Sequence, residues 1–369
     1  MKKNDSIRAE DLFLVLGHYR RVIEQRSTIP ILSHVRLTAK RGKLLIAGTD
    51  LDVELYTSIP HHGEAFDVAV GLNRLLAALD AEGVSDVRLS SEARKFIVEG
   101  RSRYAFTTLP ADEVPTIAAT DVLASFEMET ALVEQMLADV APSICTEDVR
   151  YYLNGVYIER VGDQIGFTTT DGHRLHMSRS QVPDDFPSFK GVILPRKTVG
   201  VLRELIEHEA ATNARIYFEI LAHNKMLVKI GNWKLVTKLI DGKFPDYTRV
   251  VPSDFAGSIT ADSVAVCQAA ASSAAITAVK KSALVIRPSE GLIECDNGET
   301  AQVSSRLRMA IEGQPPAMIG FNADYLRQIV TRRVDRDVVV RLGDAASPTL
   351  FEFAGDTTFS AVLMPMRVL

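Results

Sequence analysis

The chain lacks several features that would assign it to a common functional class. No apolar run approaches the roughly 18 residues that a membrane-spanning helix needs. Phosphate-cradling patterns of the GxxxxGK[ST] or GxGxxG type are also absent. The three cysteines, Cys145, Cys267 and Cys295, have no metal-ligand spacing, and we expect them to be small core residues in a reducing compartment. These absences argue against a membrane protein, a phosphate-loop enzyme and a structural zinc site.

The chain also lacks an excess of positive charge. Its 42 Lys and Arg against 47 Asp and Glu give a formal net charge of −5, which by itself counts against nucleic-acid binding. The polar start, followed by an amphipathic helix, predicts no secretory signal, so we expect a cytoplasmic protein. A hydrophobic content of 46% is ordinary for a globular chain with an ample core.

What the sequence does contain is a recurring segment. A β-rich run and then an amphipathic helix occur around Leu72, Leu194 and Phe321, which are 122 and 127 residues apart. One third of the 369-residue chain is 123 residues. A period that fits the length three times predicts one domain design used in triplicate.

Two further landmarks repeat in the same order. A strand ending in a small polar turn recurs at Asp50, Asp171 and Asp296, with separations of 121 and 125 residues. Each third then closes on a strand, at Leu109, Leu239 and Met364. Three landmarks in one order favour a true repeat, with domains expected at 1–122, 123–252 and 253–369.

Each third contains two apolar stripes with helical spacing, separated by short alternating runs typical of half-buried antiparallel strands. We therefore predict an α+β fold in which two helices pack on antiparallel sheets in each unit. The stripes are Leu12, Val15, Leu16 and Tyr19; Leu72, Leu75, Leu76 and Leu79; Val133, Met136, Leu137 and Val140; Val199, Leu202 and Ile206; Val264, Cys267 and Ala271; and Leu326, Ile329 and Val330.

The segment from Thr168 to His176 is the most enzyme-like stretch. Asp171 beside His173 could form an acid–base pair, which leaves a hydrolase centred on these two residues as the alternative from a different class. However, Asp171-Gly172 is typical of a tight turn, and no nucleophile motif accompanies it. His173 and His176 would lie on opposite faces of a strand, which is poor for a shared metal. We expect a non-catalytic scaffold without cofactor or metal.

Cationic residues follow the polar faces of the predicted helices. A solvated surface is the simpler interpretation of each one. Collectively, six helices from three similar units could gather their cationic faces on one surface, so that a negative total coexists with a local positive field. These residues include Arg26, Arg74, Arg196, Lys197, Arg203, Arg327, Arg332 and Arg333.

Several strings closely resemble the bacterial sliding clamps, the beta subunits of DNA polymerase III. They are Asp148-Val-Arg-Tyr-Tyr-Leu-Asn-Gly155, Thr170-Asp-Gly-His-Arg-Leu175, Leu194-Pro-Arg-Lys197, Asp241-Gly-Lys-Phe-Pro-Asp-Tyr247 and Met364-Pro-Met-Arg367. The resemblance spans all three thirds in the correct order, and it agrees with the three similar domains of that family.

The resemblance implies a head-to-tail homodimer that closes into a ring around duplex DNA and contacts it without regard to sequence. It places the dimer interface at Tyr104 and Phe106 of the first domain and at Ala275 and Ile276 of the third. Packing inside a sheet is the alternative for the two aromatic residues. The DNA-contacting residues that it implies, together with helix residues added for their charge, are Arg26, Arg74, Tyr151, Tyr152, Arg196 and Lys197.

The resemblance also implies a groove that binds short hydrophobic motifs of client proteins. The clients would be the polymerase catalytic subunit, the clamp loader, repair polymerases and ligase, met at the nucleoid. Methionine in such a slot can adapt to several partners. The residues are Leu153, Thr170, Gly172, His173, Arg174, Leu175, Pro245, Arg249, Val250, Pro348, Val362, Met364, Pro365, Met366 and Arg367. Packing in the core of the C-terminal strand is the alternative for Met364 and Met366.

The chain departs from the family pattern in a few places. The segment Lys2–Arg8 is polar where an alternating strand is usual, so we expect a short, shifted or missing first strand. Glu147 stands beside an expected DNA contact, and Thr248 interrupts a typical basic pair. These departures suggest a second interpretation, a diverged clamp copy that serves an accessory or repair polymerase.

Overall fold

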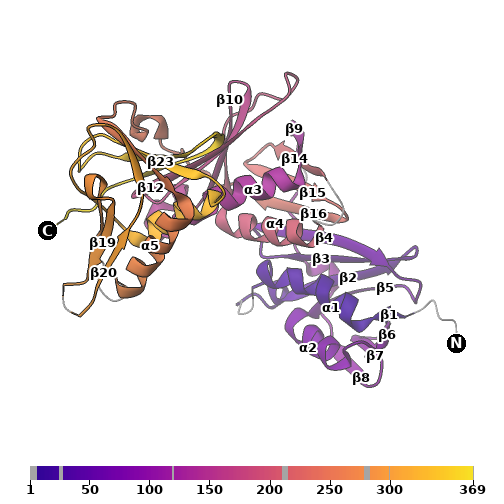
Figure 1. Ribbon diagram of the computed structural model, residues 1–369. Helices are drawn as coiled ribbons and strands as arrows, with labels where there is room; N and C mark the ends of the chain where they lie inside the picture. Colours follow the sequence, from indigo (N-terminus) through magenta and orange to yellow (C-terminus); the bar gives the residue numbers. More distant parts are fainter. Residues whose placement is uncertain are drawn as a thin grey trace. The chain divides into compact units, whose positions relative to one another are not determined.

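The computed structural model describes residues 6–24, 28–118, 120–209, 215–277, 283–298 and 300–368 (Figure 1). Two compact units divide the chain. Unit 1 comprises residues 1–134, 187–189 and 195–240, and unit 2 comprises residues 135–186, 190–194 and 241–369. No helix in the described ranges is long and apolar enough to cross a membrane.

The same order of elements occurs three times. The first third contains β1 (Ile7–Arg8), α1 (Ala9–Gly17), β2 (His34–Lys40), β3 (Lys43–Thr49), β4 (Val53–Pro60), β5 (Phe66–Gly71), α2 (Leu72–Glu82), β6 (Asp86–Glu92), β7 (Lys95–Glu99) and β8 (Arg103–Thr107). The second third contains β9 (Val122–Glu129), α3 (Thr130–Val140), β10 (Gly155–Val161), β11 (Gln164–Thr170), β12 (Arg174–Gln181), β13 (Val192–Pro195), α4 (Arg196–Glu209), β14 (Arg215–Leu221), β15 (Lys225–Ile230) and β16 (Trp233–Lys238).

The last third has the same order with one additional strand. It contains β17 (Gly257–Asp262), α5 (Ser263–Thr277), β18 (Leu284–Arg287), β19 (Leu292–Asp296), β20 (Gln302–Arg306), β21 (Met309–Gly313), β22 (Ile319–Phe321), α6 (Ala323–Val330), β23 (Asp337–Leu342), β24 (Thr349–Phe353) and β25 (Asp356–Leu363). The predicted α+β repeat is confirmed. The expected short first strand is β1, which has two residues.

The three repeated aspartates, Asp50, Asp171 and Asp296, each close a turn at the end of a strand. Each lies at or just after the end of a strand, and its Oδ1 accepts hydrogen bonds from main-chain N–H groups two or three residues later, which closes an Asx turn. The donors are Asp52 and Val53 for Asp50, at 3.0 and 2.7 Å, His173 and Arg174 for Asp171, at 3.0 and 3.1 Å, and Gly298 for Asp296, at 2.7 Å.

Five of the six predicted helical stripes lie on buried or half-buried faces, but the stripe of α5 is wrong. Val264 is 42% exposed, whereas Val266, Ala269 and Ala270 are buried. The reason is composition. Helix α5 is rich in Ala and Ser, so no face is markedly more apolar than another, and packing alone sets its rotation. Cys145 and Cys295 are buried as expected, and Cys267 is half-buried.

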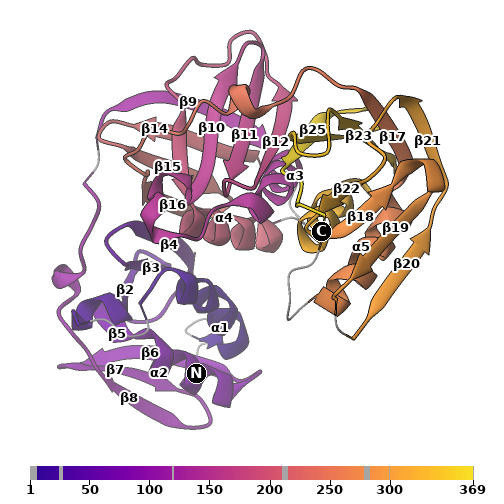
Figure 2. The same cartoon turned by 90° about the vertical axis from the view of Figure 1, so that its left-hand side faces the viewer.

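Each unit contains one large antiparallel sheet and one four-stranded sheet (Figure 2). In unit 1 the orders are β5-β2-β3-β4-β16-β15-β14-β9 and β1-β6-β7-β8. In unit 2 they are β13-β10-β11-β12-β25-β24-β23-β17-β21 and β20-β19-β18-β22. Both large sheets therefore join strands from two consecutive thirds. The predicted domain boundaries at 122 and 252 stay a prediction, because the compact units follow these sheets.

Within unit 2, a buried ion-pair network connects residues of the second third of the chain to residues of the last third. Arg333, whose side chain is 9% exposed, donates to both carboxylate oxygens of Asp139 on α3, at 2.7 and 2.9 Å. It also pairs with Asp356 and contacts Thr358 of β25. Asp139 further accepts a hydrogen bond from Ser178 at 3.0 Å. Removing the cation would leave two buried carboxylates without compensation.

We predict that Arg333→Leu lowers the free energy of unfolding by about 3–5 kcal/mol, because breaking a buried pair leaves an uncompensated charge. Chemical denaturation followed by circular dichroism measures this change. Arg336→Leu is the control, since that side chain is 41% exposed and its ion pair with Asp335 contributes under about 1 kcal/mol. Equal effects of the two substitutions would contradict a role for the buried network.

Candidate functional site

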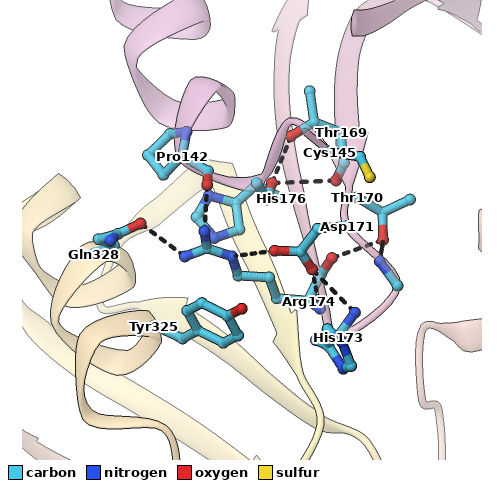
Figure 3. Close-up of polar contacts among 12 residues, drawn as sticks. Pro142, Cys145, Thr169, Thr170, Asp171, His173, Arg174, His176, Tyr325 and Gln328 are labelled. Carbon is cyan, nitrogen blue, oxygen red and sulfur yellow. Dashed lines mark hydrogen bonds and ion pairs between the residues drawn. The ribbon is translucent and has the colours of Figure 1, made fainter. Parts of the chain in front are cut away.

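The turn between β11 and β12 is the centre of the candidate site (Figure 3). Gly172 adopts a φ of +87°, a conformation that favours glycine, and a Cβ there would collide with the guanidinium of Arg150. Thr170 accepts a hydrogen bond from the Gly172 N–H at 3.1 Å and donates to the carbonyl of Arg174 at 2.7 Å. The predicted Asp-Gly turn is thus held by its own side chains.

Arg174, predicted to be a groove residue, is buried, and its side chain donates to three acceptors within the chain. It donates to the carboxylate of Asp171 at 3.0 Å, to Gln328 Oε1 at 2.8 Å and to the carbonyl of Pro142. Its guanidinium lies 4.0 Å from the ring centroid of Tyr325 on α6 (Figure 3). Arg174 therefore connects the β11–β12 turn to the last third of the chain and has little donor capacity left for a ligand.

Strand pairing brings two distant groups of predicted site residues together. Leu175 of β12 lies opposite Val362 of β25, and both are buried. Just beyond this pair, the Met364 N–H donates to the His173 carbonyl at 3.0 Å. The side chains around this junction include exposed His173, Met364 and Arg367 and half-buried Pro348, Pro365 and Met366. The junction thus presents methionine and proline side chains to solvent.

The second linker, residues 239–256 between β16 and β17, contains the predicted residues Pro245, Arg249 and Val250 and the short 3-10 segment Tyr247–Val250. Tyr247 is its buried anchor: the hydroxyl donates to Glu159 of β10 at 2.6 Å, and Phe244 stacks on Tyr157 at 4.7 Å. Pro245, Arg249 and Val250 remain exposed, and Val250 is 50% exposed. Leu153, at the end of the 3-10 segment Asp148–Leu153, is buried, and Thr170 is half-buried.

His176 is a buried structural residue. Its Nδ1 lies 2.8 Å from the carbonyl oxygen of Asp139, and its ring meets Phe359 edge-on. Burial lowers the pKa of His176 to about 4, so the ring is neutral at pH 7. Asp171 directs its carboxylate to main-chain N–H groups and to Arg174, not to the exposed His173 ring. This geometry gives no support to an acid–base pair of Asp171 and His173.

The predicted DNA-contacting residues differ in their exposure and in whether their charges are paired within the chain. Arg74 on α2 and Arg196 at the start of α4 are exposed. Lys197 is also exposed, but its Nζ donates to the Val22 carbonyl at 2.8 Å and pairs with Asp50. Arg26 lies outside the described residues. In unit 2, the exposed Tyr151 and half-buried Tyr152 meet edge-on, with centroids 5.7 Å apart.

The predicted interface residues lie on an edge strand and at a helix end. Tyr104 and Phe106 are half-buried on β8, the last strand of its sheet, with ring centroids 6.4 Å apart. Ala275 is exposed and Ile276 is half-buried, both in the last turn of α5. Nothing in the described residues completes the sheet beyond β8.

The residues that support the turn were not foreseen from the sequence. Tyr325 and Gln328 contact Arg174 from a position about 150 residues further along the chain, and no local pattern marks them. On α6, Tyr325 precedes buried Leu326 and Gln328 precedes buried Ile329, which shows only that both lie at the edge of the apolar face. Pairing of β12 with β25 is what brings them to the turn.

The architecture is a threefold α+β repeat in which strands of consecutive thirds share each large sheet, and it defines a repeat scaffold. Three family models cover the chain in order: the N-terminal domain of the DNA polymerase III beta subunit at residues 5–118, its central domain at 127–246 and its C-terminal domain at 248–367. The chain therefore belongs to the DNA polymerase III beta subunit family, the sliding clamps, and is a non-catalytic processivity subunit of that polymerase.

Individual relatives agree over nearly the whole length. The beta sliding clamp of Caulobacter vibrioides (strain NA1000 / CB15N) is 33% identical over 368 residues, covering 97% of this chain and 98% of the relative. That of Escherichia coli (strain K12) is 29% identical, covering 93% and 94%.

Solved structures of sliding clamps have the same fold. The clamp from Bartonella birtlesii, solved with bound griselimycin, superposes with a TM-score of 0.91 at 28% identity and covers 99% of both chains. The clamp from C. crescentus, described with polyethylene glycol at a proposed beta-motif tethering region, has a TM-score of 0.91 at 30% identity and covers 98% of both chains.

We predict that acid destabilises the protein partly through His176. Below pH 6.5 the unfolded chain binds a proton on this histidine that the folded protein excludes until about pH 4, so stability falls as the pH is lowered through that window. His176→Gln removes this contribution, about 3 kcal/mol at pH 4. Urea denaturation at several pH values measures the difference between wild type and variant.

The difference in unfolding free energy between the two proteins should be constant from pH 7 to 8, where the ring is neutral in both states, and should shift in favour of the variant toward pH 4. A difference that stays constant down to pH 4 would contradict the assignment of a buried neutral ring.

Proposed function

We propose that two copies of this chain join head to tail into a closed ring that encircles duplex DNA. The ring then tethers DNA polymerase III and other clients through short apolar peptides, and acts in the cytoplasm at the nucleoid. The observation that carries this proposal is the order in which strands of successive thirds pair.

The pairing follows one rule. The third strand of the first meander, β4, pairs with β16, the last strand of the second third. The third strand of the second meander, β12, pairs with β25, the last strand of the last third. The corresponding strand of the last third is β20, which has an open edge, and the last strand of the first third, β8, has an open edge too. Applying the rule once more joins β20 of one copy to β8 of another.

Such a joint satisfies the main-chain donors and acceptors of both edges, which would otherwise be exposed templates for aggregation. It is heterologous, since different ends of the chain meet, and two such joints close a dimer. The partly exposed rings of Tyr104 and Phe106 on β8 would supply apolar contact. Ala275 and Ile276 at the end of α5 would be their counterparts, because α5 packs against β19 and β20.

Enclosure explains why strong DNA contacts are unnecessary. A closed ring stays on DNA because its path off is blocked, so side chains need only weak phosphate contacts that carry no sequence information. Arg74 and Arg196 are free to make them, and Tyr151 offers an exposed ring. Lys197 is partly neutralised by Asp50, so we expect it to contribute less than Arg196.

The end of the β4–β16 pair in unit 1 and the end of the β12–β25 pair in unit 2 are equivalent strand joints within one chain. Comparing these two joints supports a client site in unit 2. The Met364–His173 backbone bond there corresponds to the Lys238–Asp52 bond of unit 1, at 2.8 Å. In unit 1 the two side chains form an ion pair, with Lys238 Nζ 2.9 Å from Asp52. In unit 2 the same place presents Met364, which is 41% exposed. Met364 lies beside partly exposed Pro365 and Met366, and exposed apolar side chains that adjoin one another are typical of a binding site.

The clients we propose are the polymerase catalytic subunit, the clamp loader, repair polymerases and ligase. Each would place leucine or aromatic side chains against Met364, Val250 and the prolines beside them. Met364 and Met366 are unbranched and can repack around different peptides, which suits a site shared by several partners.

We predict that the loaded protein stays on nicked circular DNA but is lost when that DNA is linearised, because only a closed path retains the ring. Gel filtration of the DNA after clamp-loader action measures the retained fraction. Phe106→Asp places a charge in the proposed joint, so we expect it to give monomers in analytical ultracentrifugation and no retention. Equal retention on circular and linear DNA would rule out encirclement.

For the client site, we predict that Met364→Ala weakens binding of a short leucine- and phenylalanine-containing peptide by about 10-fold, since roughly 1–2 kcal/mol of apolar contact is lost. Fluorescence polarisation with the labelled peptide measures this. Lys238→Ala at the equivalent joint of unit 1 is the matched control and should leave the affinity unchanged. A variant that kept full peptide affinity but lost DNA retention would contradict the assignment.

A further inference from the structure

Unit 1 contains a pocket of about 440 Å³ that no part of the proposed function uses. Its floor is one face of strands β2, β3, β4 and β16, and the linker residues Val114, Pro115 and Thr116 form one wall. A volume of this size lies within the range of ligand-binding pockets.

Strand register fixes which side chains lie on the floor. Arg36 pairs with Ala47, Ala47 with Tyr56, and Tyr56 with Lys234, so these four residues form one row across four strands. Directly opposed residues on adjacent strands point to the same face of a sheet. The row therefore places a cation at each end, a small residue beside Arg36 and an aromatic ring beside Lys234.

The same row in unit 2 is covered. It consists of Tyr157, Thr168, Met177 and Ser360. There the second linker places Phe244 flat on Tyr157 at 4.7 Å, and Tyr247 beside it donates to Glu159 at 2.6 Å. Two aromatic rings thus fill the space over the sheet.

The first linker, residues 108–121, has no aromatic residue, and it cannot fill the same space. Its Ile117 packs to one side, on the buried cluster of Leu221, Leu227 and Val236. The Ile117 N–H is held by the carboxylate of Glu54. The linker is thereby fixed at the margin of the sheet face, and the pocket remains beside it.

The charges of the pocket are only partly balanced. Arg36 is neutralised by a two-pronged pair with Asp67, at 2.9 and 2.6 Å. Within the described part of the chain, no carboxylate lies within ion-pair distance of Lys40 or Lys234. Lys234 instead lies over the ring of Tyr56, at 5.3 Å. Two positive charges and an aromatic surface are therefore available to a ligand.

The carboxylate of Glu54 does not fully neutralise the positive charges of Lys40 and Lys234. It is buried, accepts a hydrogen bond from the Tyr56 hydroxyl at 2.7 Å and holds the linker, and burial raises its pKa above the usual range. Its oxygens are thus directed at protein donors rather than at the open part of the pocket.

We propose that this pocket binds an acidic peptide segment of a protein partner. Carboxylates of the segment pair with Lys40 and Lys234, and a neighbouring aliphatic side chain packs on Tyr56 and the Val114–Thr116 wall. A peptide suits the place, because Lys40 on β2 and Lys234 on β16 lie on different strands of the floor, with the ring of Tyr56 on β4 between those strands. None of the pocket's residues belongs to the proposed DNA or client contacts, so its lining is distinct from both.

The test uses the full-length protein and a fluorescein-labelled peptide, Asp-Leu-Asp-Glu-Leu-Glu, in fluorescence polarisation at low salt. We expect saturable binding that the double variant K40Q/K234Q weakens at least 10-fold. Ala47→Trp fills the floor of the pocket without changing charge and should weaken binding to a similar extent. An Asn-Leu-Asn-Gln-Leu-Gln peptide should bind at least 10-fold more weakly.

Lys238→Gln is the matched control, since this lysine lies on the same strand but is paired with Asp52 outside the pocket. It should keep wild-type affinity, and so should Met364→Ala, which separates this site from the client site. Loss in K40Q/K234Q without loss in Ala47→Trp would mean general surface attraction and would overturn the pocket. Equal binding by all variants, or competition by free glutarate as strong as by unlabelled peptide, would overturn the peptide assignment.

Discussion

Unsatisfied main-chain groups at strand edges are the constraint on which the rest of this structure depends. Each third of the chain folds a meander whose third strand has a free edge, and within the chain that edge is covered twice, by β16 on β4 and by β25 on β12. These pairings build the two large sheets and bring the β11–β12 turn against the end of β25. Among the edges left open in the described sheets are those of β20 and β8, where we propose that a second copy pairs.

Repetition of a backbone does not repeat its chemistry. Asp50 and Asp171 close the same turn, yet Asp50 pairs with Lys197 and Asp171 with buried Arg174. The joints next to these turns carry an Asp52–Lys238 ion pair in unit 1 and exposed Met364 in unit 2. The side chains at the two joints are exposed, so the fold tolerates either an ion pair or an apolar side chain there. One scaffold can therefore offer an apolar site at one joint and a charged surface at the other.

The acidic total charge is compatible with the proposed DNA contact because a closed ring needs only weak phosphate contacts. Many of the cations are in fact paired within the chain. Arg333 balances Asp139 and Asp356, Arg174 balances Asp171, and Lys197 balances Asp50. The helix cations counted in the sequence therefore overstate the field available to a phosphate backbone. Exposed arginines such as Arg74 and Arg196 would suit the proposed ring, which has to hold DNA weakly enough to slide.

The threefold order of elements, most apolar helix faces and the aspartate turns were predictable from the sequence, because helix and strand periodicity and Asx turns depend on residues a few positions apart. The rotation of α5 was not, since an Ala- and Ser-rich helix carries no contrast between its faces. Nor were the burial of Arg174 by Tyr325 and Gln328, the pairing of Lys197 with Asp50, and the pocket over the Arg36–Lys234 row. Each of these joins residues that are far apart in the chain, and only the pairing of strands from different thirds decides which of them meet.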